Sequence, residues 1–247
     1  MPRSLVVLCL LGVCCFLVAS VRADYLEQKK VILLDHATHG NITNFLFRGN
    51  EPKVKDASGK DIFAYDQLKK YLSLAAQNQN FSLPSDFNLI DMKLYYFHNP
   101  LENGDIQLEK EFFDAHPSLG SFVGLEIWGD AYSPSIIPSS YRKKWAKTLG
   151  EWQHDNLPAL IPAIHQQLHT KFDKPTVFYF HCECGCDRTG EVAGSYMLAF
   201  KNWTLSQVND WNYQVAGRII LPNHSWAIAW FCYYLQQAVP GFAHLSC

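Results

Sequence analysis

The feature that most constrains the fold of this 247-residue chain is residues 181–190, HCECGCDRTG. Residues 176–180, just before it, are β-branched or aromatic, which predicts a short buried strand. After it, Val192, Tyr196 and Phe200 recur every fourth residue, which predicts a helix. A loop between a strand and a helix N-terminus turns backbone N–H groups toward one concavity, which suits an anion such as phosphate. The stretch therefore predicts an anion-binding loop in an α/β fold.

Side chains at the two ends of this loop fit phosphoryl transfer. Cys182 is the predicted nucleophile, because the N–H groups, the helix N-terminus and Arg188 would all lower the pKa of its thiol. The planar guanidinium of Arg188 would hold two phosphoryl oxygens. The Thr189 hydroxyl would stabilise the thiolate as a leaving group, and His181 would orient the loop from behind. Gly185 permits the positive φ that a tight anion nest needs.

The loop resembles the H-C-x5-R-[ST] signature of the cysteine-based protein tyrosine and dual-specificity phosphatase superfamily. Asp187, directly before Arg188, is similar to the loop of the myotubularin-like branch. The resemblance implies an α/β fold with a central, mostly parallel sheet flanked by helices, as in dual-specificity phosphatases. It also implies hydrolysis of phosphate monoesters through a phosphocysteine intermediate, with no cofactor. The phosphate would be bound by the loop itself, that is by Glu183, Cys184, Gly185, Cys186, Asp187 and Arg188.

A metal-binding loop is the alternative interpretation of the same residues. His181, Cys182, Cys184 and Cys186 are all possible ligands. They form one compact cluster without a second ligand pair, which is not the usual spacing of a tetrahedral zinc site. We therefore expect no metal here.

A phosphatase of this kind needs a general acid that protonates the departing oxygen. Residues 121–127 predict a strand that ends in Trp128-Gly129-Asp130, which resembles the W-P-D loop of the family with glycine in place of proline. Asp130 is therefore the expected acid, and it would later act as the base on the attacking water. The 52 positions between Asp130 and Cys182 exceed the roughly thirty that are common in the family. An added helix would account for this length, since Tyr141, Trp145, Leu149 and Trp152 form a helical stripe.

Asp155 is the rival acid. It lies 27 positions before Cys182, in a turn-like break between two helical stripes, but no predicted strand leads into it. If it is not the acid, we expect it to be a helix cap or a solvated surface group with little effect on activity. A third possibility is that neither aspartate is the acid.

The N-terminal residues 1–23 are typical of a signal peptide. Arg3 precedes an apolar run over 5–18, and small residues stand at the −3 and −1 positions before Asp24. We expect cleavage there and a single domain over 24–247 that is secreted or lies in the lumen of the secretory pathway or a lysosome-like compartment, without a membrane-spanning segment. Four N-x-[ST] sequons agree with this route, at Asn41, Asn80, Asn202 and Asn223.

Charge and cysteine count limit the partners and the cross-links. The full chain has a formal charge of −2, and cleavage removes two arginines, so nucleic acid is not an expected partner. Of the eight cysteines, Cys9, Cys14 and Cys15 lie in the signal peptide. The pair outside the loop, Cys232 and Cys247, is expected to form a disulfide in an oxidising lumen. Cys184 and Cys186 would be spare thiols that either trap Cys182 reversibly or only fill space.

The substrate class and even turnover stay open at this point. The acidic loop residues Glu183 and Asp187 disfavour highly charged inositol phosphates. The sequence has nothing that resembles the Lys-Asn-Arg-Tyr loop of tyrosine-specific enzymes, so strict phosphotyrosine specificity is not favoured. A phosphoprotein, a monophosphorylated lipid or a small phosphate ester all fit a shallow, dual-specificity-like site. The rival interpretation is a secreted phosphate-binding protein with the same fold and no turnover. The oligomeric state is open.

Overall fold

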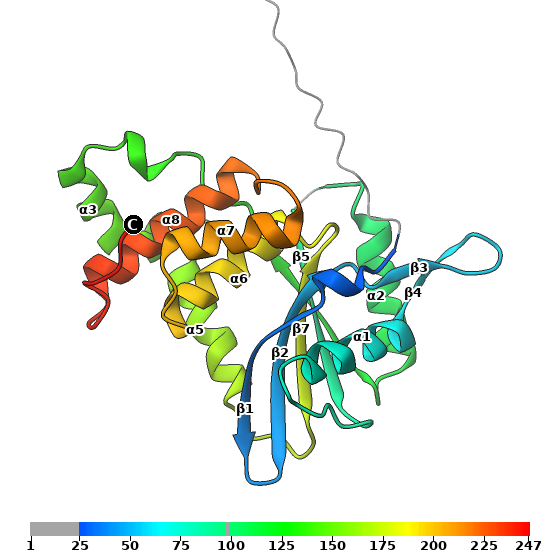
Figure 1. Cartoon of the computed structure of the whole chain (residues 1–247). Helices are drawn as coiled ribbons and strands as arrows, with labels where there is room; N and C mark the ends of the chain where they lie inside the picture. Colours follow the sequence, from blue (N-terminus) through cyan, green and yellow to red (C-terminus); the bar gives the residue numbers. More distant parts are fainter. Residues whose placement is uncertain (1–24, 97–98) are drawn as a thin grey trace, which may run out of the picture.

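The structure is a computed structural model that describes residues 25–96 and 99–247. The expected signal peptide therefore lies outside the described residues. Its central sheet has the strand order β1 (Ile32–His39), β2 (Ile42–Asn50), β7 (Thr176–Cys182), β5 (Asn88–Tyr95) and β6 (Gly120–Glu126) (Figure 1). Only the β1–β2 pair is antiparallel. The predicted α/β fold with a mostly parallel sheet flanked by helices is confirmed.

Helices cover both faces of the sheet (Figure 1). One face carries α5 (Leu157–Leu168), α6 (Asp187–Phe200), α7 (Leu205–Ala216) and α8 (Pro222–Ala238), and the other carries α1 (Tyr65–Gln77) and α2 (Asn103–Ala115). Every residue of the central strand β7 is buried. Its side chains alternate between the two cores, with Phe178 and Phe180 in one and Val177 and Tyr179 in the other. This explains why the strand has no polar alternation.

The segment between β6 and α5 is the added length that the sequence indicates. It holds a 3₁₀ turn η2 (Pro134–Ile136), α3 (Ser139–Lys147) and α4 (Leu149–Trp152), and α3 packs beside α8. The single helical stripe is broken at Thr148 into two helices, and Trp145 and Trp152 remain half-exposed instead of entering the core. A second small unit, the hairpin β3 (Lys53–Lys55) and β4 (Asp61–Phe63), follows β2, and η1 (Gln28–Lys30) precedes β1.

The helix ends follow local sequence signals. Thr204 and Gln207 form a capping box at the start of α7, and Gly217 with φ +70° ends that helix. Pro222 begins α8, where its missing N–H costs nothing. A disulfide joins Cys232 of α8 to Cys247, the pair that the cysteine count favours. Among the described helices, none has both the length and the hydropathy for a membrane crossing.

Candidate active site

The expected loop lies where β7 ends and α6 begins. Cys182 is the last residue of β7, Asp187 is the first of α6, and residues 183–186 turn between them. Gly185 has φ +65°, and a Cβ added there would lie 2.5 Å from the carbonyl oxygen of Gly49 on β2. Both the backbone angle and the close contact require glycine at this position.

Three successive loop carbonyls are turned away from the concavity and held by the N-terminal part of the domain. The carbonyl oxygen of Glu183 accepts a hydrogen bond from the backbone N–H of Glu51 at 3.2 Å. The oxygen of Cys184 accepts one from Lys30 Nζ at 2.9 Å. The oxygen of Gly185 accepts one from the guanidinium of Arg48 at 2.6 Å. With the carbonyls fixed outward, the peptide N–H groups of the loop turn inward.

Those N–H groups are available to a ligand. Within the described residues, no group accepts a hydrogen bond from the backbone N–H of residues 184–188. They adjoin the N-terminus of α6, whose dipole adds positive potential. A buried row of unpaired donors is costly unless an acceptor or water fills it. The loop thus has the form of an anion site.

Cys182 is 2% exposed and is the only free cysteine among the described residues. Burial alone would raise the pKa of its thiol, but the positive charge of Arg188 and the Thr189 hydroxyl outweigh burial and hold that pKa below its usual value. The Thr189 Oγ1 lies 3.2 Å from Cys182 Sγ and accepts a hydrogen bond from the Cys182 N–H. The structure therefore brings the predicted nucleophile and the predicted hydroxyl together.

Arg188 is 6% exposed and held by groups on the β5 side of the site. Its Nη1 donates to Glu102 Oε2 at 2.7 Å and to the carbonyl oxygen of Leu94 at 3.0 Å. Its guanidinium carbon lies 4.3 Å from the centroid of the Tyr96 ring. The hydrogen bonds involve only Nη1, and the ring covers one face of the guanidinium. Together they fix the plane of the guanidinium, so that its remaining N–H groups are oriented to bind an oxyanion.

His181 lies behind the loop in a buried ionic cluster. Its Nε2 is 3.0 Å from Asp91 Oδ1 and 3.4 Å from Glu109 Oε2, and Lys93 Nζ donates to Glu109 at 2.7 Å. Burial alone would lower the pKa of His181, but the two carboxylates raise it to about 10. These contacts hold His181 at the end of β7, and its role in orienting the loop stays a prediction.

The same cluster offers the one group of metal ligands found among the described residues. Ligand atoms of Asp91, Glu109 and His181 lie within 4.8 Å of one another. The imidazolium of His181 and the ammonium of Lys93 already supply positive charge to these carboxylates. An ionic cluster that fixes the base of the loop explains this arrangement.

Asp187 does not face a ligand. Its two oxygens accept hydrogen bonds from Arg218 at 2.9 and 2.7 Å, and Oδ1 also accepts one from the Leu221 N–H at 2.7 Å. Burial works to raise its pKa, but Arg218 and the Leu221 N–H outweigh burial and lower it. The side chain is thus a fixed carboxylate, and only its backbone N–H is placed for the anion.

The expected spare thiols are not thiols. Cys184 and Cys186 form a disulfide with each other across two positions. Reversible trapping of Cys182 by a neighbouring free thiol is therefore wrong for this state, because both neighbours are already paired. The same bond removes two of the four ligands from the metal-loop alternative.

Asp130 follows β6 in the loop that resembles W-P-D. It is 6% exposed, and its Oδ2 accepts a hydrogen bond from Gln153 Nε2 at 2.7 Å. Burial raises its pKa to about 6, with a further contribution from the nearby Asp155. Gly129 has φ +74°, which proline cannot adopt, so the replacement of proline by glycine follows from the path of the chain. Within the described residues, no hydrogen bond or ion pair joins Asp130 to Cys182 or Arg188.

Asp155 has a different place from the one expected. It is 5% exposed, and its two oxygens accept hydrogen bonds from the backbone N–H groups of Trp128 at 2.7 Å and Gly129 at 2.6 Å. The prediction of a cap or solvated surface group is therefore wrong. The turn before α5 folds back onto residues 128–130, here called the acid loop. Asp155 thereby fixes the backbone from which Asp130 projects.

A buried chain of polar groups connects the acid loop with Arg188. Glu191 lies beside Asp155, and its Oε2 is 2.6 Å from His224 Nδ1. The other ring nitrogen of His224 is 2.5 Å from the Tyr96 hydroxyl. Burial raises the pKa of Glu191 well above its usual range and lowers that of His224 to about 3. Burial thus favours the uncharged form of both side chains, and the chain of contacts ends at Tyr96, whose ring lies against Arg188.

The four sequons fall in two environments. Asn41, Asn80 and Asn202 are exposed, as an acceptor for a glycan must be. Asn223 is half-buried, and its Nδ2 donates to the carbonyl oxygen of Trp128 at 2.6 Å. A glycan on Asn223 would compete with this contact, which ties α8 to the acid loop. Glycosylation at all four positions stays a prediction.

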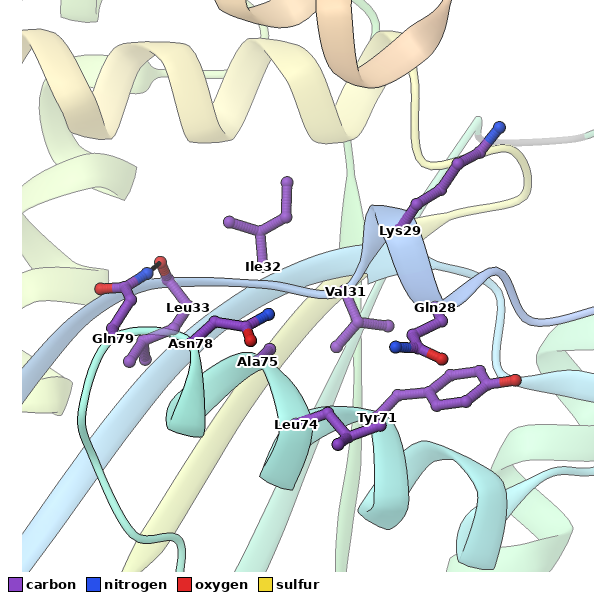
Figure 2. Close-up of a pocket in the computed structure, with 10 residues that line it drawn as sticks. All are labelled: Gln28, Lys29, Val31, Ile32, Leu33, Tyr71, Leu74, Ala75, Asn78 and Gln79. Atoms are coloured by element: carbon purple, nitrogen blue, oxygen red, sulfur yellow. Dashed lines mark hydrogen bonds between the residues drawn. The ribbon is translucent and has the colours of Figure 1, made fainter.

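A cavity of about 360 Å³ lies between η1, the start of β1 and α1, and Figure 2 shows the residues that line it. Its wall includes Leu33, Tyr71 and Gln79, and Gln79 Nε2 donates to the Leu33 carbonyl oxygen at 2.6 Å. No cysteine, histidine or carboxylate lines it. The chemistry-bearing residues of this chain thus lie at the β7–α6 loop and not at this cavity.

No protein-family model and no curated protein matches the sequence. A comparison with solved structures finds phosphatases among the matches. The core catalytic domain of the PP-IP phosphatase SIW14 from S. cerevisiae, in complex with citrate, is 16% identical over 74% of this chain and 78% of that chain, with a TM-score of 0.38. Tk-PTP in its active form is 10% identical over 74% of this chain and 88% of that chain, with a TM-score of 0.35. With identities and TM-scores this low, the geometry of the site carries the functional argument.

Sequence reasoning missed several residues that hold the site. Glu102 and Tyr96 give no signal, because their roles depend on contacts with Arg188 across the fold. Lys30 and Gln153 look like ordinary surface residues in the sequence. Arg48 lies near the end of an apolar strand, where a buried arginine is unusual, and this position is a signal in the sequence, although its contact with the loop is not.

Proposed function

We propose that this chain is a cysteine-dependent phosphatase that hydrolyses phosphate monoesters through a phosphocysteine intermediate on Cys182. One observation supports this most. The carbonyl oxygens of Glu183, Cys184 and Gly185 are all held outward by Glu51, Lys30 and Arg48, while the N–H groups of 184–188 have no acceptor within the described residues. The only free thiol of the described chain stands at the start of this anion site.

The first half-reaction transfers the phosphoryl group to sulfur. The loop N–H groups and Arg188 would bind the phosphate oxygens, and the Cys182 thiolate would attack phosphorus. An S–P bond forms and the bond from phosphorus to the ester oxygen breaks. Asp130 would give its proton to the departing oxygen, and a pKa of about 6 keeps a fraction of this carboxyl protonated near neutrality. To do so, its side chain must leave Gln153.

The second half-reaction restores the enzyme. The Asp130 carboxylate takes a proton from water as the water oxygen attacks phosphorus. The S–P bond breaks, inorganic phosphate leaves and the thiolate returns. The Thr189 hydroxyl, 3.2 Å from the sulfur, would stabilise the thiolate as a leaving group.

The finer assignments are part of the proposal. A shallow, dual-specificity-like site would take a phosphoprotein, a phospholipid or a small phosphate ester. The N-terminal pattern, the Cys232–Cys247 disulfide and the Cys184–Cys186 disulfide support a secreted or lumenal location. Expression in a secreting eukaryotic host tests the location, because N-terminal mass analysis of the secreted chain should begin at Asp24. A chain retained in the cytosol with Met1 would contradict it.

The activity is tested with para-nitrophenyl phosphate on the purified chain and its Cys182→Ser variant. We expect turnover by the wild type and a loss on the order of 10⁴-fold or more in the variant. The variant should still bind orthovanadate or phosphate, since the loop donors and Arg188 remain. Near-wild-type turnover by Cys182→Ser would contradict the mechanism.

A phosphate-binding protein without turnover is the second candidate. The contact of Asp130 with Gln153, instead of with the nucleophile, favours it. Tight phosphate binding by the wild type without release of para-nitrophenol at any pH from 4 to 8 would establish this candidate and overturn the first.

A further inference from the structure

An aromatic pocket of about 740 Å³ lies beside the acid loop. Its walls come from that loop, from α3 and α4, and from α8. Asp130 is one of its lining residues, together with Trp128, Trp145, Trp152, Trp230 and Tyr132. The segment between β6 and α5, which adds length before the nucleophile, thus builds a cavity at the position of the proposed acid.

The tryptophan rings make the lining of the pocket largely apolar. Trp145, Trp152 and Trp230 contact one another, with ring centroids 5.3 to 6.4 Å apart. The indole N–H of Trp152 donates to the Trp145 carbonyl oxygen and that of Trp230 to the Tyr132 carbonyl oxygen, both at 2.9 Å. Because these donors are used within the protein, the ring faces remain as an apolar surface.

The wall is also open to a ligand. Trp128, Trp145 and Trp152 are each 42% exposed, and Tyr132 is 64% exposed. Half-exposed aromatic rings gathered around one concavity, and not scattered singly, mark a binding site. Trp230, at 1% exposed, forms the base against which the other rings are fixed.

Contacts connect the pocket with the phosphate site. The Trp128 ring lies 6.2 Å from the Tyr96 ring, and the Tyr96 ring lies 4.3 Å from the Arg188 guanidinium carbon. The Trp128 indole N–H donates to Glu126 at 2.6 Å, which fixes the ring between the two sites. An ester whose phosphate is held by Arg188 would reach the pocket with its organic group if that group passes the Trp128 ring and Asp130, which line the pocket on the side of Tyr96.

We propose that this pocket binds an extended alkyl chain, so that the preferred substrate is the phosphate monoester of an amphiphile. This inference rests on the proposed phosphatase function. A sugar needs hydrogen-bond partners for its hydroxyl groups and a peptide needs them for its backbone, whereas the lining offers ring surface with most of its donors already used. The volume is that of a cavity for an extended molecule and exceeds what one phenyl ring fills.

The experiment measures how KM depends on chain length in n-alkyl phosphates from methyl to octyl, kept below their micelle concentrations. For the wild type we expect KM to fall about two- to fourfold per methylene until the pocket is filled, with kcat nearly constant, since chain burial is uniform binding. Trp152→Ala and Trp145→Ala should flatten this dependence and leave the values for methyl phosphate unchanged. Tyr213→Ala, at an aromatic residue on α7 that is 54% exposed and lies outside the pocket, should behave as the wild type.

Two further readouts separate the inference from the proposed function. If the chain hydrolyses para-nitrophenyl phosphate but its KM for n-alkyl phosphates does not depend on chain length, the inference is overturned and the proposed phosphatase function remains. If nothing is turned over, calorimetry with octyl and methyl phosphate on Cys182→Ser tests the pocket alone. Octyl phosphate should bind at least tenfold more tightly. Equal affinities, or tighter binding of a phosphorylated sugar or peptide that Trp152→Ala removes, would overturn the alkyl assignment.

Discussion

The guanidinium of Arg48, on β2, donates a hydrogen bond of 2.6 Å to the carbonyl oxygen of Gly185 in the loop after β7. Arg48 is fully buried, its Nη1 donates to Asn212 Oδ1 at 3.2 Å, and its guanidinium carbon lies 4.9 Å from the centroid of the Trp211 ring. A charged side chain at this depth is costly, so it depends on these contacts. The orientation of the Gly185 peptide therefore depends on a residue 137 positions earlier.

We expect Arg48→Lys to weaken phosphate binding about tenfold, because an ammonium cannot contact Gly185, Asn212 and the Trp211 face at once. The measurement is the inhibition constant of phosphate or vanadate, with circular dichroism to show that the domain is folded. Lys55→Met, at an exposed ion pair, is the control. An unchanged inhibition constant in a folded variant would show that Arg48 does not set the loop.

Asp130→Asn should lower kcat by about 10²- to 10⁴-fold, since the amide cannot protonate the leaving oxygen. The wild-type kcat should fall as pH rises through about 6, where Asp130 loses its proton, and this limb should be absent in the variant. Steady-state kinetics from pH 4.5 to 8 check both points. A variant that keeps the limb would assign the acid to another group.

Asp130→Asn should also stabilise the folded protein at alkaline pH. Burial raises the pKa of Asp130 from 3.8 to about 6, so the folded state binds this proton more tightly than the unfolded state. That contribution to stability is fully present below about 3.8 and is lost as pH rises through about 6. In urea denaturation, Asp130→Asn should therefore gain about 1–3 kcal/mol over the wild type at pH 8 and little at pH 4. Equal gains at both values would contradict the burial of an ionisable carboxyl.

Asp155→Asn should reduce kcat about 10- to 100-fold without moving the pH limb. Each N–H group binds a different oxygen of Asp155, and asparagine would place its NH2 group, a donor, against one of them. The loop would then present Asp130 less often in its productive place. Kinetics of the two aspartate variants in the same buffer series distinguish the roles. Loss of the limb in Asp155→Asn would make Asp155 the acid.

Non-reducing peptide mapping should find Cys184 linked to Cys186 and Cys232 linked to Cys247. Iodoacetamide should alkylate Cys182 alone, because its thiol has a lowered pKa, and vanadate should slow the reaction by occupying the loop. A peptide that joins Cys182 to another cysteine would contradict the free nucleophile.

The sequence predicts the strand and the helix that flank the loop, because both are recognised from local patterns. The buried run before Cys182 and the fourth-residue spacing after Thr189 report a strand and a helix, because each element carries its own periodicity. The place of Asp155 is not predictable from the sequence, because its contacts with Gly129 and Trp128 span 26 and 27 residues and no periodicity records such a contact. The sequence predicts free thiols at Cys184 and Cys186, because a pairing between such near neighbours leaves no trace in spacing.

The pocket was missed for a different reason. Trp145 and Trp152 recur at helical spacing, which usually indicates a core face, yet both are half-exposed because the chain breaks at Thr148 and turns their rings toward the acid loop. Only the break of the helix at Thr148 distinguishes this pattern from that of a helix face buried in the core.

The phosphate loop and the tryptophan pocket are built from separate lengths of chain. The loop is braced by η1, β2 and β5, whereas most of the pocket comes from the segment between β6 and α5, which adds no strand to the sheet. Under the proposed function, substrate selectivity and phosphoryl transfer would depend on separate segments of the chain. We expect a library confined to residues 131–152 to change which ester is preferred while leaving Cys182, Arg188 and Asp130 in place.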